Sequence, residues 1–374
     1  MPIKIVNTLN DLIWRDFIEA QPQANVYHTP EMFQVFSNAE GHQPALWAAI
    51  KDDGTLLAML LPVQVSLQNG SLHAWTTRAV VYGSVLTIQG EDGADGLRFL
   101  LREYNTFARG KFLLTELRNQ SPIDSIQPVL SECGYAFEEH LNYLVNLDVS
   151  EDVLWHGLSK SCRQRVHISI DKGTIVQEVS DSDQLEAAYG KLQSVYQRVH
   201  VPLAHISLFK AALDICSPLE MCKVFIASVD NTCIGACFNL IYNGRMHAWY
   251  SGSDRAYAAY NPNELLKWHS FLWGKAHGCH TFDFGGAGRP NEAYGPRAFK
   301  AKFGGELVNY GRNVCVHSPL RYQISKTIYR VARKISTTSP KPCQPFAKQV
   351  NNIFMYLAYN RPNPPFIGIT KGNQ

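Results

Sequence analysis

The stretch Thr281–Gly305, TFDFGGAGRPNEAYGPRAFKAKFGG, decides how this chain is interpreted. It starts with an apolar run, Thr281–Phe284, typical of a short β-strand, and continues into glycines that let the backbone turn and expose its amides. These glycines fit neither GxGxxG nor GxxxxGK[ST], which excludes both common nucleotide loops. Amides at Gly285 and Gly286 would suit an anionic or carbonyl-bearing ligand, and a plain turn is the alternative.

Basic and aromatic side chains alternate in the second half of the stretch. Arg297, Lys300 and Lys302 stand beside Phe299 and Phe303. Cations of this kind can hold phosphate groups, while aromatic rings can contact a base or another ring. A solvated basic edge with both phenylalanines in the core explains the same spacing, so both interpretations stay open at this point.

A helix is predicted immediately before the stretch. Asn261 is a candidate N-cap, Pro262 suits a first turn, and Glu264 completes a capping-box pattern. Gly278 ends the helix and lets the chain turn into the strand at Thr281. The sequence therefore predicts a helix-to-strand crossover.

The same order of elements occurs twice along the chain. Each half has a helix, a group of antiparallel strands, a second helix and an apolar strand. In the first half these are residues 30–40, 44–65 with a turn at 52–54, 93–110 and 111–117; in the second they are 205–216, 223–253, 261–278 and 281–284. We therefore expect an α+β protein of two similar units.

Length and composition agree with two globular domains. A chain of 374 residues exceeds what one core usually supports, and its 45% hydrophobic and 18% charged residues are ordinary for a folded protein. The formal charge of +3 excludes a whole-surface attraction to nucleic acid, so a basic site must be a local patch.

Cysteines, histidines and apolar runs indicate a cytoplasmic protein without a resident metal. Nine cysteines without a CxxC pair indicate reduced thiols. His277, Cys279 and His280 have no second cluster at metal-site spacing. We find no signal-peptide pattern and no run of about 18 apolar residues, so no transmembrane segment is expected.

Two basic helices are predicted at the ends of the second unit. The residue spacing predicts one helix over residues 150–173, in which Lys160, Arg163 and Arg165 form a basic ridge. A second basic helix is expected at 321–334, followed by a Pro-containing tail. Four further residues are candidates for binding a substrate: Tyr196, Arg198, Tyr250 and Asn261. The alternative is that they have only a structural place in the core or on the surface.

The run from Tyr260 to Gly305 resembles the second-domain signature of the Fem-like transferases, a branch of the GNAT fold. In that signature a DFGG loop is followed by an FK..FGG stretch, and both are present here. Residues 155–173 and 196–213 resemble the elements that precede the signature. The resemblance implies two tandem GNAT-like domains, each a mixed, mainly antiparallel sheet flanked by helices, at 1–149 and 150–317, with a helix at about 318–336 packing back on the first and a tail at 337–374.

The resemblance also implies an activity. Fem-like proteins join amino acids from aminoacyl-tRNA to peptidoglycan precursors, so an N-acyl- or aminoacyltransferase acting on an amine of a peptidoglycan or polysaccharide precursor is expected. Lys300, at the FK position, and the preceding Phe299 would lie at the acyl donor. The ridge at Lys160, Arg163 and Arg165 would face a phosphate-bearing precursor at the inner face of the membrane.

The donor stays open between aminoacyl-tRNA and acyl-CoA. The chain lacks the long coiled-coil insertion that some members carry, which removes one basis for a particular tRNA-binding mode. A CoA-dependent GNAT has a glycine-rich loop before its helix, whereas this chain has Ala258–Pro262 there, and proline removes one amide. A standard CoA site is therefore not expected.

The expected mechanism is direct attack by an amine on an activated ester or thioester. Positioning can supply roughly 7–11 kcal/mol, and a general base about 10²–10⁴-fold. Asp283 is the candidate base, and its alternative role is to cap the Gly285 and Gly286 amides. Lys300 would stabilise the developing negative charge. There is no GxSxG elbow and no activated cysteine for covalent catalysis.

Two other functions compete with this one. A non-catalytic protein could use the helices at 155–172 and 321–334 to hold anionic envelope precursors at the membrane surface. An acyl-CoA N-acyltransferase acting on an amino sugar or lipid precursor is the second. The choice of donor separates these alternatives from tRNA-dependent transfer.

Overall fold

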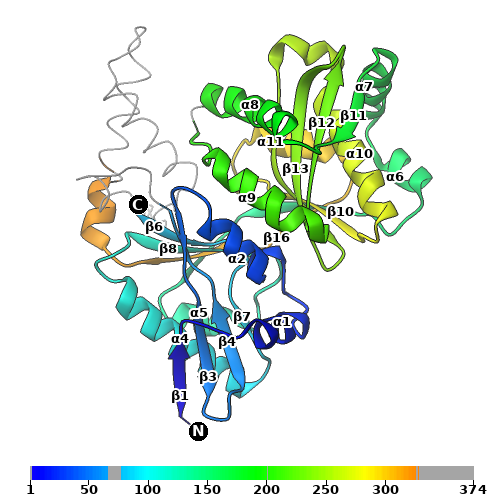
Figure 1. Cartoon of the computed structure of the whole chain (residues 1–374). Coiled ribbons are helices and arrows are strands. Elements are labelled where there is room, and N and C mark those ends of the chain that lie inside the picture. The colour runs from blue at the N-terminus through cyan, green and yellow to red at the C-terminus, as the bar shows by residue number, and fades with distance from the viewer. Residues whose placement is uncertain (1, 66–76, 200, 326, 328–374) are drawn as a thin grey trace, which may run out of the picture.

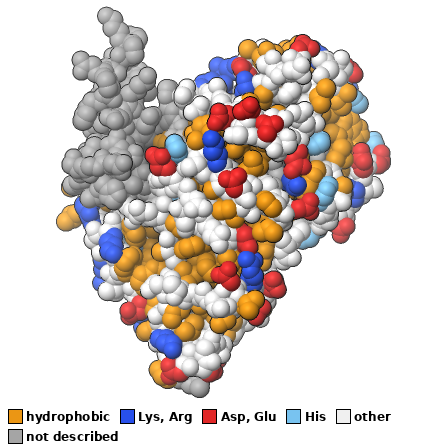
Figure 2. All heavy atoms as spheres, in the orientation of Figure 1, with side chains coloured by type: hydrophobic (Ala, Val, Ile, Leu, Met, Phe, Trp, Pro, Cys, Tyr) orange, Lys and Arg blue, Asp and Glu red, His pale blue; other side chains and the backbone are white. Residues whose placement is uncertain are grey.

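A computed structural model describes residues 2–65, 77–199, 201–325 and 327 of the chain. It contains two lobes, each built around its own β-sheet structure with helices on the outside (Figure 1). Acidic and basic side chains are interspersed over the face shown in Figure 2, as the small net charge predicts. No helix of the described residues combines the length and apolar character needed to cross a membrane.

The second lobe contains a seven-stranded sheet in which only β14 and β15 run parallel. The predicted meander at 223–253 is confirmed, and residues with positive φ form its two turns. In sheet order, the strands are β11 (Ile175–Glu178), β12 (Cys222–Val229), β13 (Thr232–Tyr242), β14 (Arg245–Ser253), β15 (Thr281–Gly286), β10 (Leu141–Asn146) and β16 (Glu306–Asn309).

Helix α10 (Pro262–Ala276) packs against β12, β13 and β14 and joins the two parallel strands. Below it, the rings of Phe271, Phe282 and Phe284 meet in the core with centroids 4.8–5.9 Å apart. The other helices of this lobe are α6 (Glu151–Gly157), α7 (Lys160–Asp171), α8 (Ser182–Arg198), α9 (Ile206–Cys216) and α11 (Gly295–Lys300), with 3-10 turns η2 (Ser217–Leu219), η3 (Arg255–Tyr260) and η4 (Ala301–Phe303).

The predicted capping box at the start of α10 is wrong. Asn261 occupies the N-cap position with a left-handed φ of 49°, and its side chain does not cap the helix. Glu264 is buried, and its Oε1 accepts a hydrogen bond from Arg165 Nη1 at 2.8 Å. The carboxylate is therefore held by α7 and does not reach back to the N-cap amide.

The single helix predicted over residues 150–173 is also wrong, because the chain breaks between α6 and α7. Leu158 is extended at the end of α6, and Ser159 caps α7 by accepting a hydrogen bond from the Cys162 amide. A second N-cap serine, which competes with the helix for backbone hydrogen bonds, explains the break. Ile170, near the end of α7, is 53% exposed.

The first lobe repeats the order of the second with its sheet split in two. One sheet runs β1 (Ile3–Val6), β3 (Trp47–Lys51), β4 (Leu56–Leu60) and β7 (Leu86–Thr87); the other runs β2 (His42–Pro44), β5 (Val63–Val65), β6 (Arg78–Val81), β8 (Leu114–Arg118), β17 (Arg312–Val316) and β9 (Ala136–Glu138). Strands β6 and β8 are parallel, as β14 and β15 are. The predicted hairpin at 44–65 and the predicted α+β duplication are confirmed.

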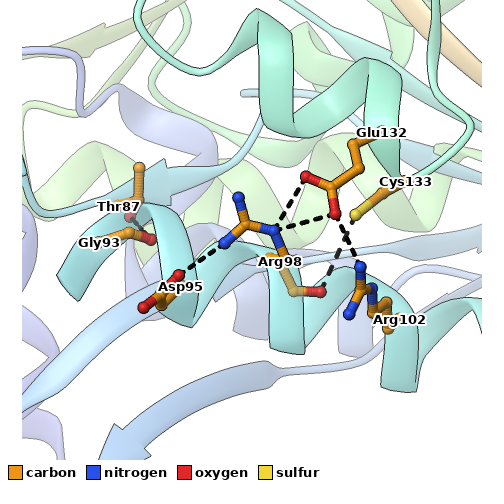
Figure 3. A network of polar contacts seen from close by, with 7 residues as sticks. All are labelled: Thr87, Gly93, Asp95, Arg98, Arg102, Glu132 and Cys133. Carbon is orange, nitrogen blue, oxygen red and sulfur yellow. Dashed lines mark hydrogen bonds and ion pairs between the residues drawn. The ribbon is translucent and has the colours of Figure 1, made fainter. Parts of the chain in front are cut away.

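The helices of the first lobe are α1 (Asp11–Glu19), η1 (Val26–His28), α2 (Pro30–Ser37), α4 (Glu91–Ala108) and α5 (Gln127–Glu132). Buried Leu97, Leu100 and Tyr104 fasten α4 to the sheet. On the outer side, Arg98 Nε donates to both oxygens of Glu132 on α5, at 3.0 and 2.9 Å (Figure 3).

Two strands cross the predicted boundary between the domains. β10 precedes residue 150 but lies between β15 and β16 of the second lobe, whereas β17 falls within 150–317 but lies between β8 and β9 of the first lobe. Sheet membership therefore does not follow the limits 1–149 and 150–317. Tyr322, in a helical segment at 319–325, packs with Leu114 and Val314 of the first lobe. The tail at 337–374, like most of the helix predicted at 318–336, lies outside the described residues.

Candidate functional site

A cleft of about 670 Å³ lies between the lobes, where β14 and β15 separate. The two strands are paired over three residues each, and His247 opposite Asp283 is the last pair. Beyond it, β14 runs on to Ser253 while β15 enters the glycine loop, which we define as Phe284–Gly286. A point where neighbouring parallel strands part is a usual place for a ligand in α/β sheets.

Both lobes contribute side chains to the cleft. The first lobe supplies Tyr27, His42, Tyr82, Arg118 and Gln120, and β17 adds Arg312. The second lobe supplies His247, Tyr250, Lys267, Phe299, Lys300 and the glycine loop. A ligand in this cleft would therefore touch both domains.

Lys300 fastens the glycine loop. Its Nζ donates to three backbone carbonyls, those of Phe284 at 2.6 Å, Gly285 at 3.2 Å and Gly286 at 2.7 Å. An ammonium group has three N–H donors, so all of them are used within the loop. Burial lowers the pKa of Lys300 to about 8, with the Asp283 carboxylate acting in the opposite direction. The side chain thus places a positive charge beside the loop and holds its shape.

Asp283 lies beneath the glycine loop and is fully buried. Its Oδ1 accepts a hydrogen bond from the Gly285 amide at 2.7 Å, which is the capping role considered for this carboxylate. Burial raises the pKa of Asp283, but its interactions with His247 and the Gly285 amide outweigh burial and lower the pKa overall. The carboxylate is therefore ionised at neutral pH and faces His247.

His247 is a site residue that the sequence analysis missed. Its Nδ1 lies 3.6 Å from Asp283 Oδ2, and its ring meets the Tyr27 ring edge-on with centroids 5.9 Å apart. The signal that could have found it is the parallel register, which places a histidine of β14 directly opposite the aspartate of the DFGG loop. That register is a tertiary feature and cannot be counted along the chain.

Lys267 of α10 is a second missed residue. It lines the cleft floor at 4% exposure, and its Nζ has no hydrogen-bond partner within the described part of the chain. Burial lowers its pKa, which agrees with an amine that lacks a counterion. A lysine in a helix is easily taken for a solvated position, since lysines are seldom fully buried.

The wall of the cleft formed by the first lobe is cationic. Arg118 Nε and Arg312 Nη1 share one carboxylate oxygen of buried Glu116, at 2.5 and 3.1 Å, and the Arg118 guanidinium lies 5.1 Å from the centre of the Tyr82 ring. Burial raises the pKa of Glu116, yet Arg118, Arg312 and Arg78 lower it overall. Three guanidinium groups around one carboxylate leave an excess of positive charge, which suits an anionic ligand.

Several predicted site residues do meet in this cleft. Tyr196, Tyr250, Gly285, Gly286 and Phe299 all line it together with Lys300. The Tyr196 and Tyr250 rings lie 5.8 Å apart, so α8 and β14 present a joint aromatic surface. The structure thus assembles residues that are over a hundred positions apart in the sequence.

Other predicted site residues do not line the cleft. Lys160 is exposed on α7, Arg163 donates to backbone carbonyls at the end of α6, and Arg165 pairs with α10. Arg198 ends α8 and Asn261 precedes α10. Their predicted contacts with a substrate stay predictions. No group of three or more histidine, cysteine or acidic residues placed to hold a metal occurs among the described residues.

Comparisons with known proteins identify the domain and the fold. Residues 160–300 match the acetyltransferase (GNAT) domain family. The crystal structure of FemX superposes with a TM-score of 0.66 at 14% identity, over 87% of this chain and 99% of FemX. No curated protein matches the sequence.

Two further solved structures share the architecture. L-PGS from Bacillus licheniformis has a TM-score of 0.54 at 12% identity, covering 86% of this chain and 97% of L-PGS. A tandem GNAT protein from the clavulanic acid biosynthesis pathway gives 0.54 at 12% identity, covering 84% and 99%. Residues 160–300 thus match an acetyltransferase (GNAT) domain, and over most of its length the chain has the fold seen in FemX and in the tandem GNAT protein.

Proposed function

We propose that this protein transfers an acyl or aminoacyl group from an activated donor to an amine of an anionic cell-envelope precursor, a peptidoglycan or polysaccharide intermediate. One observation carries the proposal: a cleft between two GNAT-like domains holds a lysine-fastened glycine loop opposite an arginine-rich wall. The GNAT domain match and the likeness to FemX support acyl transfer.

In the proposed reaction, the acceptor amine attacks the acyl carbonyl beside the glycine loop. The Lys300 ammonium donates its protons to loop carbonyls, so it acts on the developing oxyanion through its charge and by fixing the loop. Holding donor and acceptor in one cleft between two lobes supplies the positional part of the catalysis, roughly 7–11 kcal/mol.

The acceptor is proposed to carry phosphate. Arg118 and Arg312 present cationic groups to the cleft, and their planar guanidinium groups match phosphate geometry. The α7 ridge at Lys160, Arg163 and Arg165 would extend this attraction outside the cleft toward tRNA or the cytoplasmic face of the membrane. Aminoacyl-tRNA and acyl-CoA are the two donors to be distinguished.

The test is a transfer assay with purified protein, charged tRNA or acyl-CoA, and a panel of nucleotide-linked amino-sugar and peptide precursors, with products identified by mass spectrometry. We expect the acceptor to gain one acyl group with one class of donor. Lys300→Ala should lower kcat by about 10²–10³-fold, the scale measured for lost oxyanion stabilisation. Lys210→Ala, which removes an exposed lysine of α9, is the matched control and should leave turnover unchanged.

Two results would contradict the proposal. Absence of transfer with both donors excludes the enzyme, and wild-type turnover by Lys300→Ala removes this residue from the mechanism. Tight binding of the anionic acceptor without binding of either donor would instead favour the non-catalytic binding protein, for which the arginine-rich wall is the specific observation.

A further inference from the structure

A cleft histidine, His247, faces a fully buried carboxylate, Asp283. His247 and Asp283 face each other across the parallel strands β14 and β15, at the last position where the strands are paired. Residues opposite each other in this register project to the same face of a sheet. The pair is therefore built into the sheet at the mouth of the strand separation.

The Gly285 amide fixes the orientation of the Asp283 carboxylate. Its Oδ1 accepts a hydrogen bond from that amide at 2.7 Å, and Oδ2, which makes no hydrogen bond within the described residues, lies 3.6 Å from His247 Nδ1. An ionised carboxylate accepts hydrogen bonds only, so Asp283 favours the tautomer with a proton on the facing Nδ1. Nε2 is then the unprotonated nitrogen on a ring that lines the cleft.

Three other histidines line the cleft, and none of them has this arrangement. His205 Nδ1 lies 3.4 Å from Glu40 Oε2, but that carboxylate is 74% exposed. The Nδ1 of His140 donates to its neighbouring backbone carbonyl at Leu141, and burial together with Arg312 lowers its pKa to about 3, which makes it a very weak base. His42 is bonded through Nδ1 to the Glu40 carbonyl, and burial lowers its pKa too. None of the three faces a buried carboxylate, so His247 is distinguished by its partner.

Neighbouring groups hold the His247 ring in place. A Cβ at Gly285 would lie 3.3 Å from His247 Cε1, so the glycine at this position lets the loop approach the ring. Tyr27 packs edge-on from the other lobe. The titratable and charged groups of the surrounding elements are Tyr27 on η1, Arg245 on β14, Lys267 on α10, Asp283 on β15 and Lys300 on α11.

We propose that His247 is the general base of the transfer reaction and that Asp283 positions it. The inference rests on the proposed function. As the neutral acceptor amine attacks, a C–N bond forms, and the amine proton moves to His247 Nε2. The acyl–oxygen or acyl–sulfur bond then breaks, its electron pair leaves with the donor oxygen or sulfur, and that atom takes the proton back from His247.

The first test reads the imidazole directly in the free protein. Nitrogen chemical shifts of ¹⁵N-histidine-labelled protein, with His247 assigned by comparison with His247→Gln, identify which ring nitrogen carries the proton. We expect the Nδ1–H tautomer in the wild type and a shift toward Nε2–H in Asp283→Asn, whose amide can donate to Nδ1. An Nε2–H tautomer in the wild type would overturn the proposal without any assay of activity.

The second test is kinetic and uses the donor and acceptor found by the transfer assay. His247→Gln should lower kcat by about 10²–10⁴-fold with KM changed only a few-fold, since a general base acts in the transition state. His277→Gln, which changes an exposed histidine stacked on Trp273, is the control. If the wild type is active and His247→Gln is equally active, His247 is not the general base, while the proposed function stands. If the wild type is inactive, both the proposed function and the role of His247 are refuted.

Discussion

At the scale of single residues, we expect Lys300 to give the cleft a dependence on pH. Its pKa of about 8 means that the ammonium loses its proton as the pH rises through 8, and one loop carbonyl then loses its donor. We expect the ratio of wild-type to Lys300→Met kcat/KM to be constant below pH 7 and to fall above pH 8. Measuring both enzymes from pH 6 to 9.5 checks this, because deprotonation of the acceptor amine affects both equally. A constant ratio throughout would show that the charge of Lys300 has no part in the reaction.

The glycine at position 285 combines backbone and side-chain demands. Its φ of +68° is unfavourable for other residues, and an added Cβ would press on His247. Gly278→Ala is the matched control, because Gly278 has a φ of +76° with open space around it. Because of backbone strain, the unfolding free energy of both variants, measured in urea, should be about 1–2 kcal/mol lower than that of the wild type. Only Gly285→Ala should also lower kcat, so equal activity of the two variants would contradict the predicted contact with the ring.

At the scale of elements, two carboxylates each paired with two arginines differ in burial. Glu116 on β8 is 4% exposed between Arg118 and Arg312, whereas Glu132 on α5 is 43% exposed between Arg98 and Arg102 (Figure 3). Removing one partner of a buried ion pair leaves uncompensated charge, while exposed pairs are screened by water. Glu116→Gln should therefore cost about 3–5 kcal/mol of unfolding free energy, and Glu132→Gln should lower the Tm only slightly.

Glu116 should also make the first lobe less stable in acid. Its arginines lower the folded-state pKa below the ordinary value of 4.5, so its contribution to stability is present above pH 4.5 and is lost as the pH falls below it. In urea unfolding, the unfolding free energy of the wild type should fall between pH 7 and pH 3. The unfolding free energy of Glu116→Gln should fall by a smaller amount over the same range. Parallel pH dependences of the two proteins would exclude Glu116 as the source.

At the scale of the whole molecule, strand exchange makes the two lobes depend on each other. A fragment of residues 1–149 lacks β17, which lies between β8 and β9, and a fragment of 150–317 lacks β10, which lies between β15 and β16. Missing inner strands leave unpaired backbone groups on both neighbours. We expect both fragments to be unfolded or aggregated by circular dichroism, whereas a fragment of 140–311, which keeps all seven strands, should retain more β structure. Stable folding of 150–317 alone would contradict this.

Much of the fold was predictable because it depends on local patterns. Glycine and asparagine turns at positive φ set the hairpins, and apolar spacing set the helices on either side of them. The continuous helix through Leu158 and the capping box at Asn261 were wrong predictions. Ser159 accepts a hydrogen bond from the Cys162 amide and starts a new helix, and Arg165 binds the Glu264 carboxylate that the capping box would have used. Local chemistry predicts that an element exists better than it predicts where the element ends.

The candidate site divides in the same way. By itself, the sequence determined the glycine loop, the lysine that follows it and the duplication of the α+β unit, because each depends on residues close together in the chain. Only the tertiary structure decided that Lys300 turns back onto the loop carbonyls, that His247 faces Asp283, and that Arg118 and Arg312 form the opposite wall. Lys300 reaches the loop from helix α11, whereas the contacts of His247, Asp283 and the two arginines depend on strand register and on strands exchanged between sheets. A shift of one residue in register would turn a side chain on a strand to the other face of its sheet.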